Sequence, residues 1–167
     1  MHVLNIHERE FDLPLATVGS LIDTLASKSD HIWPSDKWPA MHLDRPLSVG
    51  AVGGHGPVRY SVEEYRPGRE IHFRFLAPSG FKGKHAFEVE DRQGQTVLRH
   101  VLEMRAAGQA CLSWPLLFRP LHDALIEDGF DRATVALGID LPNPSRWPIY
   151  VRVLRFAIKT FSKAGRR

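Results

Sequence analysis

The sequence predicts an α+β fold in which a curved antiparallel sheet of about six strands wraps around one long C-terminal helix. In residues 58–104, large apolar residues occupy every second position, and turn signals divide the segment into two hairpins. Such alternation is typical of strands with one face on a core and the other in water. Residues 120–137 have the apolar spacing of a long helix, which can cover the buried face and enclose an apolar cavity.

The part of the chain before these hairpins adds a strand and a helix. Pro14 suits the first turn of that helix, and a residue before proline avoids the α region, so Trp33 and Trp38 are expected to end short helical turns. The expected elements are, in order, a strand at 3–12, a helix at 14–25, a turn-rich segment at 27–39, a weaker strand at 43–52 and a flexible connection at 53–57.

The turns set the expected strand registers. A two-residue Pro67-Gly68 loop predicts the facing pairs Arg66 with Arg69, Val62 with Phe73 and Tyr60 with Phe75, and puts Glu64 on the inner face opposite Ile71.

The second hairpin leaves two registers open. A four-residue loop over 91–94 sets His85 opposite His100, whereas a two-residue Gln93-Gly94 loop places His100 beside Phe87. Either register puts both histidines on the otherwise apolar face.

The long helix carries a third histidine. Its apolar side is expected to hold Leu121, Leu125, Gly129 and Ala136, with His122 near the middle. Pro115 and Pro120 are expected to break up the approach to this helix, and Asp128 and Arg132, four residues apart, could pair at its edge.

The order of elements resembles a known superfamily. The resemblance covers about residues 3–137, and the segments that carry it are HEREFDLPLATVGSLIDTL, HIWPSDKWPAM, GPVRYSVEEYRPGREIHFRF, GKHAFEVE, TVLRHVLEM and PLHDALIEDGFDRA. This order is similar to the helix-grip fold of the START/polyketide-cyclase (SRPBCC) superfamily. The resemblance implies a cavity between sheet and long helix that holds a hydrophobic small molecule. The superfamily shares no catalytic motif, so the resemblance carries over no catalytic residue.

The predicted function is binding of a hydrophobic or aromatic small molecule, either a lipid or a polyketide-like compound. The expected ligand-binding residues are Tyr60, Val62, Phe73, Phe75, His85, Phe87, His100, Leu102, Met104, Leu121 and Leu125. The alternative is a cyclase or dehydratase that uses His85, His100 or His122 as acid and base near neutral pH. Each of these residues could instead be an ordinary part of the core.

The composition of the chain excludes some kinds of metal and disulfide site and indicates where the protein resides. The single cysteine, Cys111, excludes an intrachain disulfide and a cysteine-based zinc site, and the histidines lack HxH or HExxH spacing. No metal and no cofactor are therefore expected. The N-terminus lacks the apolar run of a secretory signal, and no apolar stretch is long enough to cross a membrane. These absences predict a cytoplasmic protein.

The C-terminal segment carries the basic charge of the chain. Residues 145–167 contain seven Lys or Arg and no Asp or Glu, so the body itself is slightly acidic and no nucleic-acid partner is expected. We divide the chain into a helix-grip domain at 1–140, and a linker with a basic amphipathic helix at 141–167. The basic stripe comprises Arg152, Arg155, Lys159, Lys163 and Arg166, and another face holds Val151, Leu154, Ile158 and Phe161. Residues 148–163 could pack on their own domain, form a homodimer or contact a membrane surface.

Overall fold

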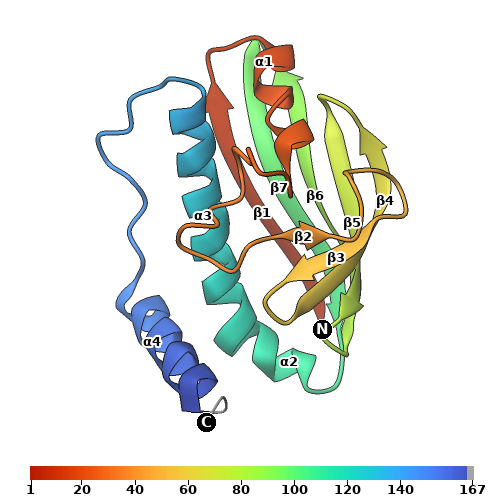
Figure 1. Ribbon diagram of the computed structural model, residues 1–167, viewed down its shortest axis with the longest axis vertical. Coiled ribbons are helices and arrows are strands. Elements are labelled where there is room, and N and C mark those ends of the chain that lie inside the picture. The colour runs from red at the N-terminus through yellow and green to blue at the C-terminus, as the bar shows by residue number, and fades with distance from the viewer. Residues whose placement is uncertain (165–167) are drawn as a thin grey trace.

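The computed structural model describes residues 1–164, and the side chains of residues 1–160. A seven-stranded antiparallel sheet has the order β1-β7-β6-β5-β4-β3-β2 and curves around the long helix α3 (Figure 1). The strands are β1 (His2–Phe11), β2 (His42–Leu43), β3 (Val52–His55), β4 (Val58–Arg66), β5 (Glu70–Ala77), β6 (Phe81–Arg92) and β7 (Gln95–Ala106). The helices are α1 (Leu15–Gly19), η1 (Ile22–Thr24), α2 (Ala110–Ser113), η2 (Trp114–Phe118), α3 (Arg119–Ala136) and α4 (Ile149–Ala164). This architecture confirms the predicted α+β class.

The expected N-terminal helix is divided in two. Gly19 ends α1 where the helix meets the β4–β5 turn, and a Cβ built on Gly19 would lie 2.0 Å from the carbonyl oxygen of Gly68. Only glycine allows this backbone approach. A 3₁₀ turn then leads into residues 27–39, which contain turns and bends rather than the short helical turns expected.

The weak strand and the flexible connection were predicted wrongly. Only the two ends of the region, β2 and β3, are strands, and β3 includes most of the glycine-rich stretch. β3 pairs with both β2 and β4, because glycines let the backbones approach: a Cβ at Gly53 would lie 1.9 Å from the carbonyl oxygen of His42. The sheet therefore has seven strands, and His55 is held in a strand.

The first hairpin confirms two of the three expected pairs. Val62 faces Phe73 and Tyr60 faces Phe75, as predicted. Arg66 faces Glu70 rather than Arg69, because a register shift between Val62 and Glu64 inserts one residue. Such a bulge exchanges the faces of the residues that follow it. Tyr65 consequently lies opposite Ile71, while Glu64 lies opposite His72 and forms an ion pair with Arg66, so its inward placement was wrong.

The second hairpin adopts the shorter of the two loops. Arg92 faces Gln95, and Gln93 and Gly94 have φ values of 56° and 88°, as a two-residue turn of this handedness requires. His100 therefore lies opposite Phe87, and His85 lies opposite Leu102.

Pro115, in η2, and Pro120, in the first turn of α3, do not interrupt the helical path. Residues 110–136 run through α2, η2 and α3, and η2 is a π-helix in which the amide of Arg119 donates to the carbonyl of Trp114, five residues back. Wider π turns of this kind accommodate residues that do not fit the α-helical ladder. The long helix itself begins and ends close to the predicted residues.

Candidate functional site

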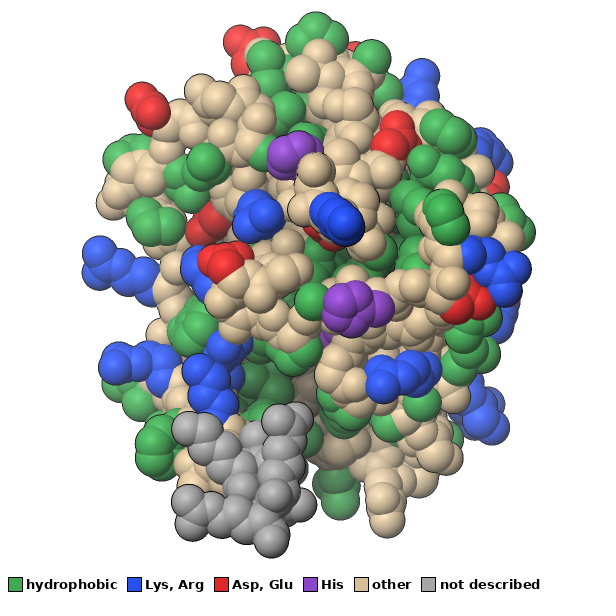
Figure 2. Space-filling view, in the orientation of Figure 1, with side chains coloured by type: hydrophobic (Ala, Val, Ile, Leu, Met, Phe, Trp, Pro, Cys, Tyr) green, Lys and Arg blue, Asp and Glu red, His purple; other side chains and the backbone are tan. Residues whose placement is uncertain are grey.

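A cavity of about 540 Å³ lies between the sheet, α3 and α4. Its walls come from the 33–39 segment, β3 to β7, η2, α3 and one face of α4. In Figure 2 a hollow with apolar side chains is visible between α4 and β3. Ligand sites in proteins commonly have volumes of roughly 300–1,000 Å³, so this space is large enough for a small organic molecule.

The expected ligand-binding residues fall into two groups. Those that line the cavity are Phe75, His85, His100, Leu102, Leu121 and Leu125, and His122 joins them. Those that lie in the packed core instead are Tyr60, Val62, Phe73, Phe87 and Met104. Alternation along a strand identifies the inner face, but the inner face of this sheet is larger than the cavity. Whether the lining residues bind a ligand stays a prediction.

Three histidines meet on the cavity wall. His100 Nε2 lies 3.3 Å from His85 Nδ1, and the His100 and His122 ring centroids are 4.9 Å apart. One nitrogen in each ring is buried without a hydrogen-bond partner among the described residues: His85 Nε2, His100 Nδ1 and His122 Nε2. Buried polar atoms usually have partners, so these three are available to a ligand.

Burial determines the charge of these rings. It lowers the pKa of His85 and of His100 well below the ordinary value, and neighbouring histidines lower it further. Burial also lowers the pKa of His122, although its contact with Asp123 opposes this. The wall therefore presents neutral imidazoles, each of which can donate one hydrogen bond and accept another.

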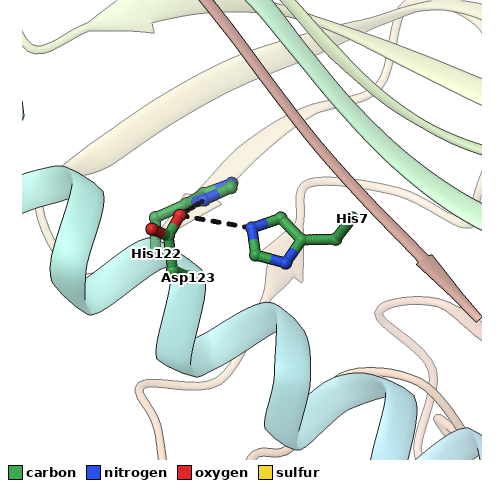
Figure 3. A group of neighbouring side chains, drawn as sticks. All are labelled: His7, His122 and Asp123. Atoms are coloured by element: carbon green, nitrogen blue, oxygen red, sulfur yellow. Dashed lines mark hydrogen bonds and ion pairs between the residues drawn. The ribbon is translucent and has the colours of Figure 1, made fainter. Parts of the chain in front are cut away.

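Beside His122, a charged cluster joins α3 to β1 (Figure 3). Asp123 Oδ1 lies 3.4 Å from His122 Nδ1 and 3.2 Å from His7 Nε2, while His7 Nδ1 lies 2.7 Å from Glu127 Oε1. Burial lowers the pKa of His7, but the hydrogen bonds to Asp123 and Glu127 outweigh it and raise the value to about 9. The histidine contacts in turn hold the Asp123 carboxyl below its usual pKa, against the effect of its burial. His7 is thus protonated near neutral pH and links two carboxylates.

His7, His122 and Asp123 also have the composition of a metal site. One ligand atom from each lies within 4.8 Å of the other two. A divalent ion would need both imidazoles in their neutral form, so it would have to displace the proton of His7. A hydrogen-bonded acid–base cluster accounts for the same contacts, and the expectation of no metal stays a prediction.

His55 is a cavity residue that the sequence prediction missed. Its Nδ1 lies 3.2 Å from the hydroxyl oxygen of Tyr60, and its ring centroid lies 4.5 Å from that of Trp33. Burial lowers the pKa of His55 to about 3. The sequence did not indicate that His55 faces the cavity, because β3 has only four residues and is too short to show an alternation of apolar and polar residues.

Further aromatic residues, which the sequence analysis did not assign to the cavity, complete its wall. They include Phe81 from β6 and Trp114 and Phe118 from η2. The signal in the sequence that could have identified Trp114 and Phe118 is the cluster of aromatic residues just before the long helix. Trp33 and Trp38 also line the cavity. Asp30 holds this segment by accepting hydrogen bonds from the backbone amides of Ala26, Ile32 and Trp33.

Asp128 pairs with the cavity rim rather than with Arg132. Its side chain is fully buried and accepts hydrogen bonds from Lys37 Nζ, Trp38 Nε1 and Trp147 Nε1, all at 2.7 Å. Arg132 instead donates to the carbonyl oxygen of Asp30. The predicted pair was wrong because i,i+4 spacing shows which residues are neighbours on a helix, but not which faces are covered by other segments.

α4 closes the side of the cavity next to Asp128. The Arg155 guanidinium carbon lies 4.0 Å from the ring centroids of both Trp38 and Trp147, and Arg155 donates to the carbonyl oxygen of Lys37. Val151 is buried, and Arg155, Ile158 and Lys159 line the cavity. Of the predicted stripes, the side chains of Phe161 and Lys163 and all of Arg166 lie outside the described residues. The division near residue 140 stays a prediction.

The fold and the cavity define the helix-grip class, and structural comparison gives the same result. No protein-family model and no curated protein matches the sequence. Ara h 8.0201 superposes with a TM-score of 0.57 at 9% identity, over 82% of this chain and 98% of that chain. A protein from Thermobifida fusca gives 0.60 at 14% identity, over 81% and 93%. Norcoclaurine synthase from Thalictrum gives 0.59 at 11% identity, over 82% and 94%. At these identities the likeness shows the fold alone, and that fold is the helix-grip fold, as the sequence predicted.

Proposed function

We propose that the protein binds a flat, largely apolar small molecule with oxygen substituents, of polyketide-like or aromatic type. The observation that carries this proposal is a cavity with apolar and aromatic walls and three buried histidine nitrogens that lack partners. Apolar walls with a few placed polar groups are typical of ligand sites. Aromatic rings favour stacking with a flat ligand, and neutral imidazoles suit hydroxyl and keto groups. Two proteins of this fold are named in connection with small-molecule biosynthesis: DynU16, from the dynemicin biosynthetic locus, and norcoclaurine synthase.

Tryptophan fluorescence tests this binding directly, because Trp33, Trp38 and Trp114 line the cavity. We expect hydroxylated naphthalene or anthraquinone probes to quench the emission saturably, and a fluorescent fatty acid to bind more weakly. Leu121→Trp places a larger ring in the cavity and should weaken binding. Val135→Trp is the matched control, since Val135 is exposed on the same helix and should leave binding unchanged. A folded wild-type protein that binds none of these probes would overturn the proposal.

A second candidate, acid–base catalysis in the same cavity, has one specific observation in its favour. Asp123 contacts Nδ1 of His122, and Nε2 of His122 is buried without a partner. A carboxylate that orients a histidine in this way leaves the other nitrogen to exchange a proton with a bound molecule. Such an enzyme would catalyse an aldol-type cyclisation or a dehydration of a poly-ketone.

His122→Gln separates the two candidates. For an enzyme, absorbance assays with 1,3-diketone substrates should show turnover by the wild type and at least a hundredfold loss in the variant. Probe binding should change only a few-fold. Binding without turnover by the wild type would leave the carrier function and reject the enzyme.

A further inference from the structure

The outer face of α4 carries an apolar stripe that no described part of the chain covers. Ile149, Val153 and Phe156 are four and three residues apart, so they share one side of the helix, and they are 77%, 58% and 73% exposed. Tyr150 and Leu116 extend this surface, since the Tyr150 hydroxyl donates to the Leu116 carbonyl oxygen and both side chains are at least half exposed. A contiguous apolar surface of this kind usually has a partner.

Packing within the chain uses the other side of α4. Val151 is buried, Arg155 stacks on Trp38 and Trp147, and Ile158 lines the cavity. The stripe is therefore not required to attach the helix to the domain. It is an additional apolar face on a helix that is already anchored.

Positive charge lies beside the stripe. Arg152 and Lys159 are seven residues apart and exposed, so they lie on the same flank, and residues 141–164 contain no Asp or Glu. Figure 2 shows basic and apolar side chains together over α4. An apolar stripe with a basic flank has the character of a helix that lies in the plane of a membrane interface.

We infer that α4 docks on an anionic lipid surface, with Ile149, Val153 and Phe156 inserted among the lipids and Arg152 and Lys159 near the headgroups. A second copy of the chain is a poorer partner, because two such helices packed stripe to stripe would bring their basic flanks together without acidic residues to pair with them. Within the described residues, no helix is both long and apolar enough to cross a bilayer. The contact is therefore peripheral, and it is independent of what the cavity binds.

Vesicle sedimentation with the full chain tests the inference. We expect binding to vesicles of phosphatidylcholine with phosphatidylserine, weak binding to phosphatidylcholine alone, and weakening by salt. Phe156→Asp and Arg152→Glu should each reduce binding about tenfold or more. Leu76→Asp and Arg105→Glu, exposed positions on the sheet, are the matched controls and should bind like the wild type.

Equal sedimentation with neutral and anionic vesicles, or none with either, would overturn the inference. So would a stable dimer that Phe156→Asp converts to a monomer, since the stripe would then face a second copy. Circular dichroism checks that each variant is folded. The probe titration on the same samples shows separately whether the cavity still binds.

Discussion

His100 Nε2 lies 3.3 Å from His85 Nδ1 on the cavity wall, and the second nitrogen of each ring is buried without a partner. Neighbouring neutral imidazoles inside an apolar core are costly for folding and useful for recognition.

Stability should fall on acidification because His85 and His100 stay neutral in the fold. Their pKa values are lowered in the folded state, so below pH 6.5 the unfolded chain binds protons that the fold cannot. Each of these two histidines should contribute about 1.4 kcal/mol to the fall in the free energy of unfolding between pH 7.5 and 5.5. His55 and His122, whose pKa values are also lowered, act in the same direction.

Urea unfolding at the two pH values measures this loss. The double variant His85→Leu, His100→Leu should reduce it by roughly 2–3 kcal/mol. Phe87→Leu, which disturbs the same packing without a titrating group, should keep the full pH dependence. An unchanged acid sensitivity in the double variant would contradict the burial of neutral histidines.

His7 should produce the opposite dependence at alkaline pH. Its folded pKa of about 9 lies above the unfolded value of 6.5, so its stabilisation is complete below pH 6.5 and is lost as pH rises through 9. We expect the wild type to lose on the order of 2 kcal/mol between pH 7 and 9.5, and His7→Gln to show little of this loss. If both proteins give parallel curves, His7 is not held as a cation. Added zinc that raises the wild-type Tm at pH 8 but not that of His7→Gln would show a metal site instead.

Asp128 should be essential to the rim of the cavity. Asp128→Asn replaces a buried carboxylate that accepts from two indoles and Lys37, and an amide cannot satisfy all three donors. Loss of one partner from a buried charged network costs about 3 kcal/mol or more. Chemical denaturation should show this loss, together with a red shift in tryptophan emission. Asp36→Asn, an exposed partner of Arg132, is the control and should cost less than about 0.5 kcal/mol.

Gly19 should not tolerate a side chain. In Gly19→Ala the new methyl group would lie 2.0 Å from the Gly68 carbonyl oxygen, so α1 and the β4–β5 turn must separate. We expect a loss of about 2 kcal/mol in thermal or urea unfolding. Ala16→Ser, on the exposed part of the same helix, should change stability by less than about 0.5 kcal/mol. An equally small effect at Gly19 would mean that the two segments are not in contact.

The sequence by itself determined the elements whose pattern is long and periodic. Strand alternation over 58–104 placed Phe75, His85, His100 and Leu102 on the inner face, and helical spacing placed His122 toward it. These assignments depend on local geometry, in which side-chain direction repeats every two or 3.6 residues. The positions of β4 to β7 and α3 could therefore be predicted.

Tertiary structure decided everything that depends on contacts between distant segments. The bulge that turns Glu64 outward, the short strand that brings His55 to the cavity, and the burial of Asp128 under Trp38 and Trp147 leave no periodic trace. Nor does periodicity show how much of an inner face is solid core, which separates Tyr60 and Phe87 from the cavity lining. A cavity is the space left after all segments have packed, so its residues are fixed by the whole fold rather than by any one segment.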